Sequence, residues 1–116
     1  MIRLVRLYTG DDGQSHVSEE QVELAADGHD LVSKWEHATG IRFEETPPHS
    51  QLDWHYAPRR QYVVNLEGGV EIEVGDGTKR ILGTGDILLA EDTTGQGHIS
   101  RAVAGKPRRS LFITLD

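Results

Sequence analysis

Residues 54–69 read WHYAPRRQYVVNLEGG, and this stretch decides the fold. A histidine, two arginines and a glutamine come directly before the β-rich run Gln61–Leu66, and the pair Gly68–Gly69 closes the segment as a turn would. Further along the chain, the polar segment AEDTTGQGH ends in a second histidine, His98. We therefore expect these two stretches to face each other inside one small β-domain.

The rest of the chain is also a series of short β-type segments separated by turn residues. Val70, Ile72 and Val74 alternate with glutamates, which predicts a strand with one buried and one wet face. Asp76–Gly77 is typical of a tight hairpin turn. Other strands are predicted at 2–8, 41–46, 79–82, 87–89, 98–103 and 110–115, residues 17–24 fit a short strand or a helical turn, and 25–40 show no clean period. No long helix is indicated, so the pattern predicts an antiparallel sandwich or barrel.

Alternation also predicts which side chains of residues 51–56 share a face. Gln51, Asp53 and His55 have one parity, and Leu52, Trp54 and Tyr56 have the other. Trp54 and Tyr56 are therefore expected on the outer face, in packing or dimer contacts.

Composition limits the classes of protein to consider. The 116 residues suit one domain (1–116), and the absence of cysteine excludes disulfides and thiolate metal sites. A net charge of −7 argues against nucleic-acid binding. The chain has no apolar run of the ~20 residues that span a bilayer, and MIRLVRLYTG lacks the apolar region of a signal peptide. We expect a cytoplasmic protein with no membrane partner.

The segment from His55 resembles the first motif of the cupin superfamily, the small RmlC-like jelly-roll barrels. That motif has two histidines, a glutamate and a glycine at fixed spacing. In this sequence His55 stands at the first histidine, Ala57 at the second, Gln61 at the glutamate and Gly68 at the glycine. The second cupin motif is matched by Gly85 at its start and by His98, which arrives two residues late.

The resemblance covers about residues 41–115 and implies an all-β, antiparallel jelly-roll barrel with little helix, similar to compact single-domain bacterial cupins. It also implies a homodimer, and a cavity that binds a small molecule. A typical cupin holds iron, manganese, nickel or zinc with three histidines and a glutamate. Here His55, Gln61 and His98 are the metal ligands that remain, with no anionic ligand among them. The ligand count favours no metal over a weakly bound divalent ion.

The candidate catalytic residues are His55 and His98, since a neutral imidazole can act as a general base. Gln61 is expected to hydrogen-bond a histidine or a ligand, and Arg59 or Arg60 to bind a substrate carboxylate through its planar fork. Asp92 is a further candidate substrate-binding residue, and it is expected to orient His98; alternatively, Thr93 and Thr94 line the mouth of the pocket. In the simpler interpretation, Arg59 and Arg60 are solvated surface residues, and the segment before His98 is a turn whose backbone needs Gly95 and Gly97.

Three kinds of function remain open from the sequence. The first is an enzyme that acts on a small organic, carboxylate-bearing molecule, with His55 and His98 as bases or weak metal ligands. The second is a cupin that binds or senses a ligand without turnover. The third is a structural cupin whose site has decayed. The sequence names no substrate.

Overall fold

The computed structural model describes residues 1–103 and 105–116, and these residues form an all-β domain. None of them forms a helix that is long and apolar enough to span a membrane. The strands are β1 (Ile2–Thr9), β2 (Ser15–Val22), β3 (Ala25–Asp27), β4 (Asp30–Val32), β5 (Ala38–Thr46), β6 (Gln51–His55), β7 (Gln61–Glu67), β8 (Val70–Glu73), β9 (Lys79–Leu82), β10 (Ile87–Glu91), β11 (His98–Ala102) and β12 (Arg108–Leu115).

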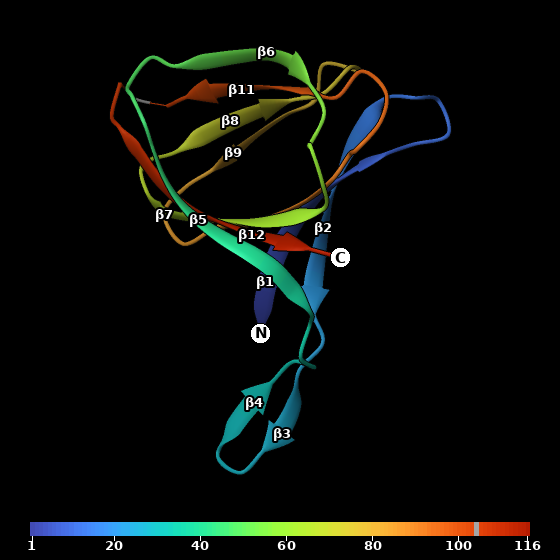
Figure 1. The fold of residues 1–116 in the computed structure, drawn as a ribbon, viewed down its shortest axis with the longest axis vertical. Coiled ribbons are helices and arrows are strands. Elements are labelled where there is room, and N and C mark those ends of the chain that lie inside the picture. The colour runs from blue at the N-terminus through green and yellow to red at the C-terminus, as the bar shows by residue number, and fades with distance from the viewer. Residues whose placement is uncertain (104) are drawn as a thin grey trace.

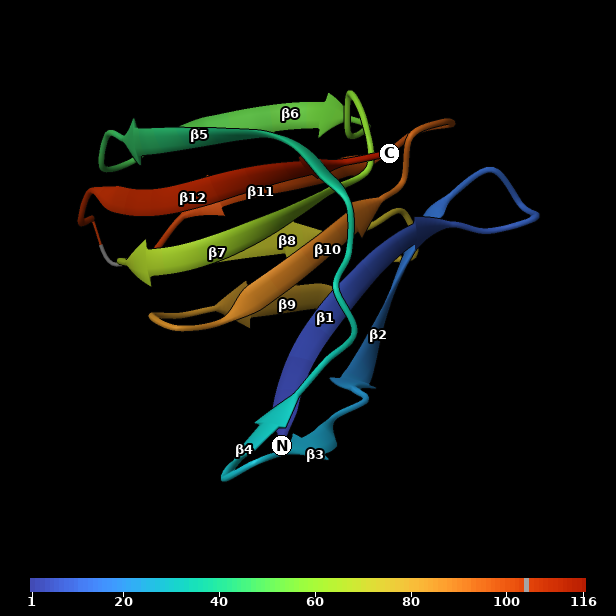
Figure 2. The same cartoon turned by 60° about the horizontal axis from the view of Figure 1, so that its bottom comes forward.

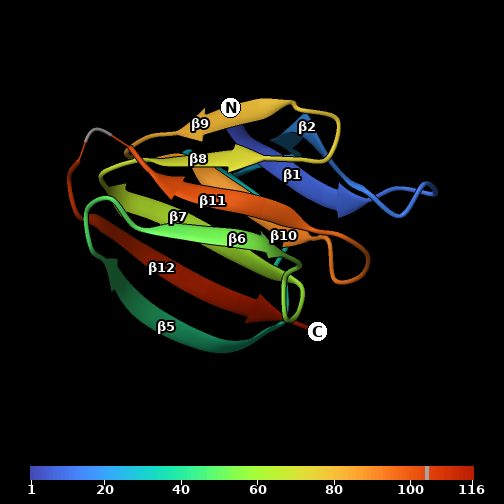
Figure 3. The same cartoon turned by 90° about the horizontal axis from the view of Figure 1, so that it is seen from above.

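Two sheets stack face to face, and a small hairpin of β3 and β4 projects from them (Figure 1). The larger sheet has the order β2-β1-β10-β7-β12-β5, and the smaller one β6-β11-β8-β9. Seen from above, β12 lies between β5 and β7, and β11 lies between β6 and β8 (Figure 3). The pair β1–β10 is parallel, and the other pairs in the two sheets are antiparallel.

The predicted all-β class is confirmed, but closure into a jelly-roll barrel is not. Within the described residues no backbone ladder joins the larger sheet to the smaller one. Each sheet therefore keeps two edges: β2 and β5 in one, β6 and β9 in the other. Such edges expose unpaired backbone groups, so what covers them matters for function.

The core fills the space between the two sheets. On β7, Gln61, Val63 and Asn65 are buried while Tyr62 and Val64 between them are less so, which is the alternation of a strand with one inner face. The same inner face carries Phe112 of β12, which pairs with Val63 and packs on the core. The buried core residues are Val5, Leu7, Ala57, Val63, Val70, Ile72, Val74, Leu82, Leu88 and Ala90.

A second apolar cluster lies on the outer face of the larger sheet, where the segment between β4 and β5 crosses it (Figure 2). Tyr62 belongs to this cluster and donates a hydrogen bond from its hydroxyl to Glu36 of the crossing segment at 2.6 Å. Residues 25–40, which show no period in the sequence, therefore contain the β3–β4 hairpin, this crossing segment and the start of β5.

The predicted parity of β6 is wrong at Leu52 because the strand is irregular. His55 pairs with His98, but Ser100 pairs with Leu52, so Asp53 and Trp54 of β6 lie opposite the single residue Ile99 of β11. A bulge of this kind shifts the alternation by one residue. His98 and Ser100 share a face, and Leu52 therefore faces the same side as His55.

Asn65 joins the ends of four strands at the end of the sandwich opposite His98. It is 2% exposed, and its amide nitrogen donates to the carbonyl oxygens of Gly68, Leu82 and Gly83 at 2.8–3.2 Å. Its amide oxygen accepts a hydrogen bond from Nε of Arg108 at 2.7 Å.

Replacing Asn65 by alanine should therefore lower the free energy of unfolding by about 2–4 kcal/mol, because several buried polar groups lose their partner at once. Urea denaturation measures this change. Gln51→Ala, an exposed polar residue on β6, is the control and should cost less than about 0.5 kcal/mol. Equal effects of the two substitutions would contradict this role for Asn65.

Candidate active site

The two predicted site histidines lie directly opposite each other on neighbouring strands. His55 ends β6, His98 begins β11, and the two residues are register partners. Their ring centroids are 4.3 Å apart, and the ring planes are inclined at 54°. The prediction that the two stretches face each other is thus met by a cross-strand pair.

A buried carboxylate fixes the orientation of His98. Asp92 is fully buried, and its Oδ2 lies 2.6 Å from Nδ1 of His98, which is itself 5% exposed. A carboxylate can only accept, so Nδ1 of His98 carries a proton, and in the neutral imidazole the lone pair is then on Nε2. Asp92 therefore occupies the position that the sequence analysis predicted for it, next to His98.

Ser15 completes the arrangement around Asp92. Its Oγ donates to the same Oδ2 at 2.7 Å, and Ser15 is buried. The sequence analysis missed Ser15, because it stands 77 residues from Asp92 in a turn-like segment with no motif. The other carboxylate oxygen, Oδ1, has no hydrogen-bond partner among the described residues, so Asp92 is held mainly through His98 and Ser15.

His55 is oriented from the opposite side. Its Nδ1 lies 2.8 Å from the carbonyl oxygen of Asp53 and must donate to it, which leaves Nε2 with a lone pair as well. Burial lowers the pKa of His55, and the nearby His98 lowers it further, against the opposing effect of the Asp53 carbonyl. His55 is therefore neutral at pH 7.

The predicted residues Gln61, Arg59 and Arg60 make no hydrogen bond to either histidine within the part of the chain that the structure describes. Gln61 is buried on the inner face at the start of β7. Arg60 precedes it and pairs with Glu91, whose other oxygen binds Nε of Arg6 at 2.6 Å. Arg59 is exposed. The guanidinium of Arg60, which was predicted to bind a substrate carboxylate, is thus already paired with Glu91.

The residues present do not fit a cupin-type metal. Ala57 stands at the second histidine position, and its side chain packs in the core instead. In residues 1–103 and 105–116, no group of three or more histidine, cysteine, aspartate or glutamate side chains is placed to hold a metal ion. Two imidazoles and one neutral amide form a donor set with no anion, which binds divalent ions weakly.

The edge strands β5 and β6 carry exposed side chains on their inner faces, the face that also bears His55. Leu52 faces the same side as His55, yet it is 57% exposed. Arg42 lies on the inner face of β5, opposite Phe112, and its side chain is 73% exposed.

No protein-family model and no curated protein matches the sequence. Solved structures do match it. A DUF861 family protein from Thermotoga maritima has a TM-score of 0.53 and 24% identity, over 64% of this chain and 77% of that one. A Cupin 2 conserved barrel domain protein from Salinispora arenicola has a TM-score of 0.53 and 14% identity, over 66% of this chain and 61% of that one. A conserved protein of unknown function from Streptococcus pyogenes has a TM-score of 0.53 and 20% identity, over 74% and 69%.

These likenesses establish a class of fold: two stacked, mostly antiparallel sheets. The fold is similar to that of a cupin barrel domain, as the motif resemblance predicts. This chain spans about three fifths of the Salinispora protein. At these identities the likeness concerns the fold alone, and function must be argued from the site.

The close approach of the two histidine strands depends on Gly97. Its φ is +79°, and a Cβ built on it would overlap the carbonyl oxygen of His55. We expect Gly97→Ala to lower the free energy of unfolding by more than about 3 kcal/mol, because both the backbone conformation and the contact are lost. Chemical denaturation measures this.

Gly77→Ala is the matched control for Gly97→Ala. Gly77 has a similar φ of +87°, but a Cβ there would meet nothing within 4 Å. Only the cost of the left-handed conformation remains, about 1–2 kcal/mol. Similar losses for the two variants would show that the contact with His55 is unimportant.

The lowered pKa of His55 predicts a pH dependence of stability. Below the unfolded pKa of about 6.5, the unfolded chain takes up a proton that the folded protein resists. The contribution of neutral His55 to the free energy of unfolding is therefore complete above this pH, and it is lost as the pH falls toward the lowered pKa of His55 in the folded protein. The His55→Gln variant should therefore lose stability less steeply between pH 6.5 and 5, by up to about 1.4 kcal/mol per pH unit. Identical slopes in wild type and variant would refute the assignment.

Proposed function

We propose that this protein binds a small organic molecule beside His55 and His98, and that His98 acts on it as a general base without a metal. The observation that carries the proposal is the hydrogen bond from Nδ1 of His98 to the buried Asp92. It supports a tautomer whose Nε2 can accept a proton, and a carboxylate that would stabilise the imidazolium that forms.

The surroundings of the histidines support this chemistry over metal chemistry. His55 is neutral at pH 7, so it adds no positive charge that would oppose protonation of His98. The donor set lacks an anionic ligand, as described above. General bases of this kind contribute about 10²–10⁴-fold to a rate. A site that binds its ligand without turnover is the second candidate, and the low exposure of His98 favours it.

The test begins with binding and continues with proton exchange. Saturation-transfer NMR with a panel of small 2-oxo and 4-oxo acids, pyruvate and levulinate first, identifies a ligand. The exchange of its C–H protons in D₂O then reports proton abstraction by the protein. We expect His98→Gln to reduce this exchange at least 100-fold. Binding and exchange that are both unchanged in His98→Gln would refute the site, and binding without exchange in the wild type identifies the second candidate.

Asp92→Asn tests the positioning role of the carboxylate. The asparagine side chain keeps the size of aspartate but removes its charge, and it can donate to the ring of His98. Long-range ¹H–¹⁵N NMR should show the Nδ1–H tautomer in the wild type and a population of Nε2–H in the variant. The exchange rate should fall at least tenfold. An unchanged tautomer with an unchanged rate would leave Asp92 without this role.

We also propose that the protein is a homodimer, formed through the outer face of β5. This strand is an unpaired edge of the larger sheet, and Ile41 and Phe43 on its outer face are 63% and 77% exposed. Their register partners Ile113 and Leu111 extend the apolar surface onto β12. A second copy placed there would cover both the edge and the apolar face.

Phe43→Asp should therefore convert a dimer to a monomer, as measured by size-exclusion chromatography with light scattering. The control is Ile81→Asp, which places the same charge on an exposed apolar residue of the other sheet. The control should remain a dimer. A wild-type protein that is a monomer at 100 μM, or two variants that behave alike, would refute this interface.

A further inference from the structure

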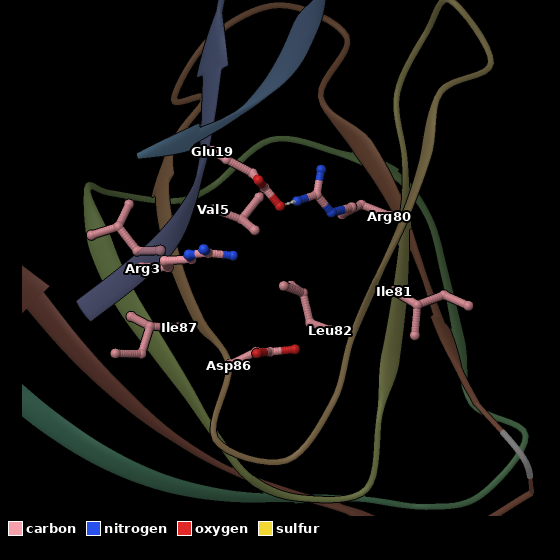
Figure 4. A pocket seen from close by; sticks show the side chains of 9 residues that line it. Arg3, Val5, Glu19, Arg80, Ile81, Leu82, Asp86 and Ile87 are labelled. Carbon is pink, nitrogen blue, oxygen red and sulfur yellow. Dashed lines mark ion pairs between the residues drawn. The ribbon is translucent and has the colours of Figure 1, made fainter. Parts of the chain in front are cut away.

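The two sheets leave a second opening, on the side away from the histidines. There β9, the edge of the smaller sheet, faces β1 and β2 of the larger one, and no ladder connects them. An ion pair between Arg80 of β9 and Glu19 of β2 bridges the opening. Below it lies a pocket of about 250 Å³ (Figure 4). Its size is below the usual range of drug-sized sites, roughly 300–1,000 Å³, so it suits a small molecule.

The inner wall of this pocket is apolar and is formed by residues of the core between the sheets and of the apolar cluster on the outer face of the larger sheet. Val5 and Leu82 are buried members of the main core, and Leu4 belongs to the outer cluster. Ile87 adds a partly buried side chain next to them. Because these strands are held by ladders on their other side, the wall is fixed, and an apolar group placed against it would be shielded from water.

The rim of the pocket carries four charged side chains, and three of them already have partners. Glu19 and Arg80 pair with each other. Asp86 accepts a hydrogen bond from the backbone nitrogen of Gly83 at 2.7 Å through Oδ2, across the turn between β9 and β10. Arg3 makes no ion pair or side-chain hydrogen bond with the residues that the structure describes.

Arg3 is also directed at the pocket. Figure 4 shows its guanidinium reaching into the space between Glu19 and Asp86, beside Leu82. Alternation agrees, because Arg3 has the parity of Val5 and Leu7, the inner face of β1. A guanidinium has a planar fork of donors that matches the two oxygens of a carboxylate.

We propose that this pocket is a second ligand site, which takes a small carboxylate with a short apolar body. Arg3 binds the carboxylate, and the body lies against Val5, Leu82 and Ile87. A phosphate fits less well, because it carries more charge than one unpartnered arginine balances, and Glu19 and Asp86 stand close by. The site is independent of the proposed chemistry at His98, since none of its lining residues belongs to the group of His55, His98, Asp92 and Ser15.

The experiment is a titration of the ¹⁵N-labelled protein with isobutyrate, isobutanol and inorganic phosphate, followed by ¹H–¹⁵N NMR. Isobutyrate should cause saturable shifts at the amides of Leu4, Val5 and Leu82. Isobutanol has a similar body but no charge, and it should bind at least tenfold more weakly. Equal binding of isobutanol, or tighter binding of phosphate, would overturn the carboxylate assignment.

Two variants connect the binding to Arg3. Arg3→Gln should weaken isobutyrate binding at least fivefold, while Arg109→Gln should not change it. Arg109→Gln removes the same positive charge as Arg3→Gln, but on the outer face of β12. Glu19→Gln should strengthen binding about threefold or more, because it removes a negative charge and releases Arg80 as a second cation. Unchanged binding in Arg3→Gln, or weaker binding in Glu19→Gln, would overturn the proposal.

Discussion

The hydrogen-bonded group of Asp92, His98 and Ser15 is the interaction on which the site depends. Asp92 follows β10 and Ser15 begins β2, both in the larger sheet, whereas His98 begins β11 in the smaller one. One buried carboxylate therefore connects the two sheets at this end. It also sets the ring of His98 and, through the His55–His98 pair, the position of β6. A buried charge of this kind is tolerated only because its partners are present, so the geometry is strongly specified.

The same end of the molecule is closed by backbone as well as by side chains. The backbone nitrogen of Ala57 donates to the carbonyl oxygen of Asp92 at 2.9 Å, and the methyl group of Ala57 lies in the core. Ala57 stands at the position of the second histidine of the cupin motif, and its methyl group cannot ligate a metal.

Much of the fold could be predicted from the sequence, because alternation and turn residues are local signals. The strands at 61–67, 70–73 and 79–82 follow directly from them. The failures have physical causes. Leu52 changes face because a bulge in β6 shifts the alternation, and a bulge leaves no mark in composition. Ser15 could not be found, because its partnership with Asp92 depends on a contact across 77 residues. The sequence indicated Arg60 as a ligand-binding arginine, because its ion pair with Glu91 depends on a contact between distant segments that the sequence does not show.

The position of β12 has a consequence for how the chain folds. Residues 108–115 lie between β7 and β5, and β5 has no other neighbour in the larger sheet. β1 pairs in parallel with β10, and Val5 finds its partner at Leu88. During synthesis, therefore, the N-terminal half can form local hairpins, but β5 stays without a strand partner until residues 108–115 have left the ribosome. Topologies with so many distant pairings fold slowly, and the apolar face of β5 is exposed for that whole interval.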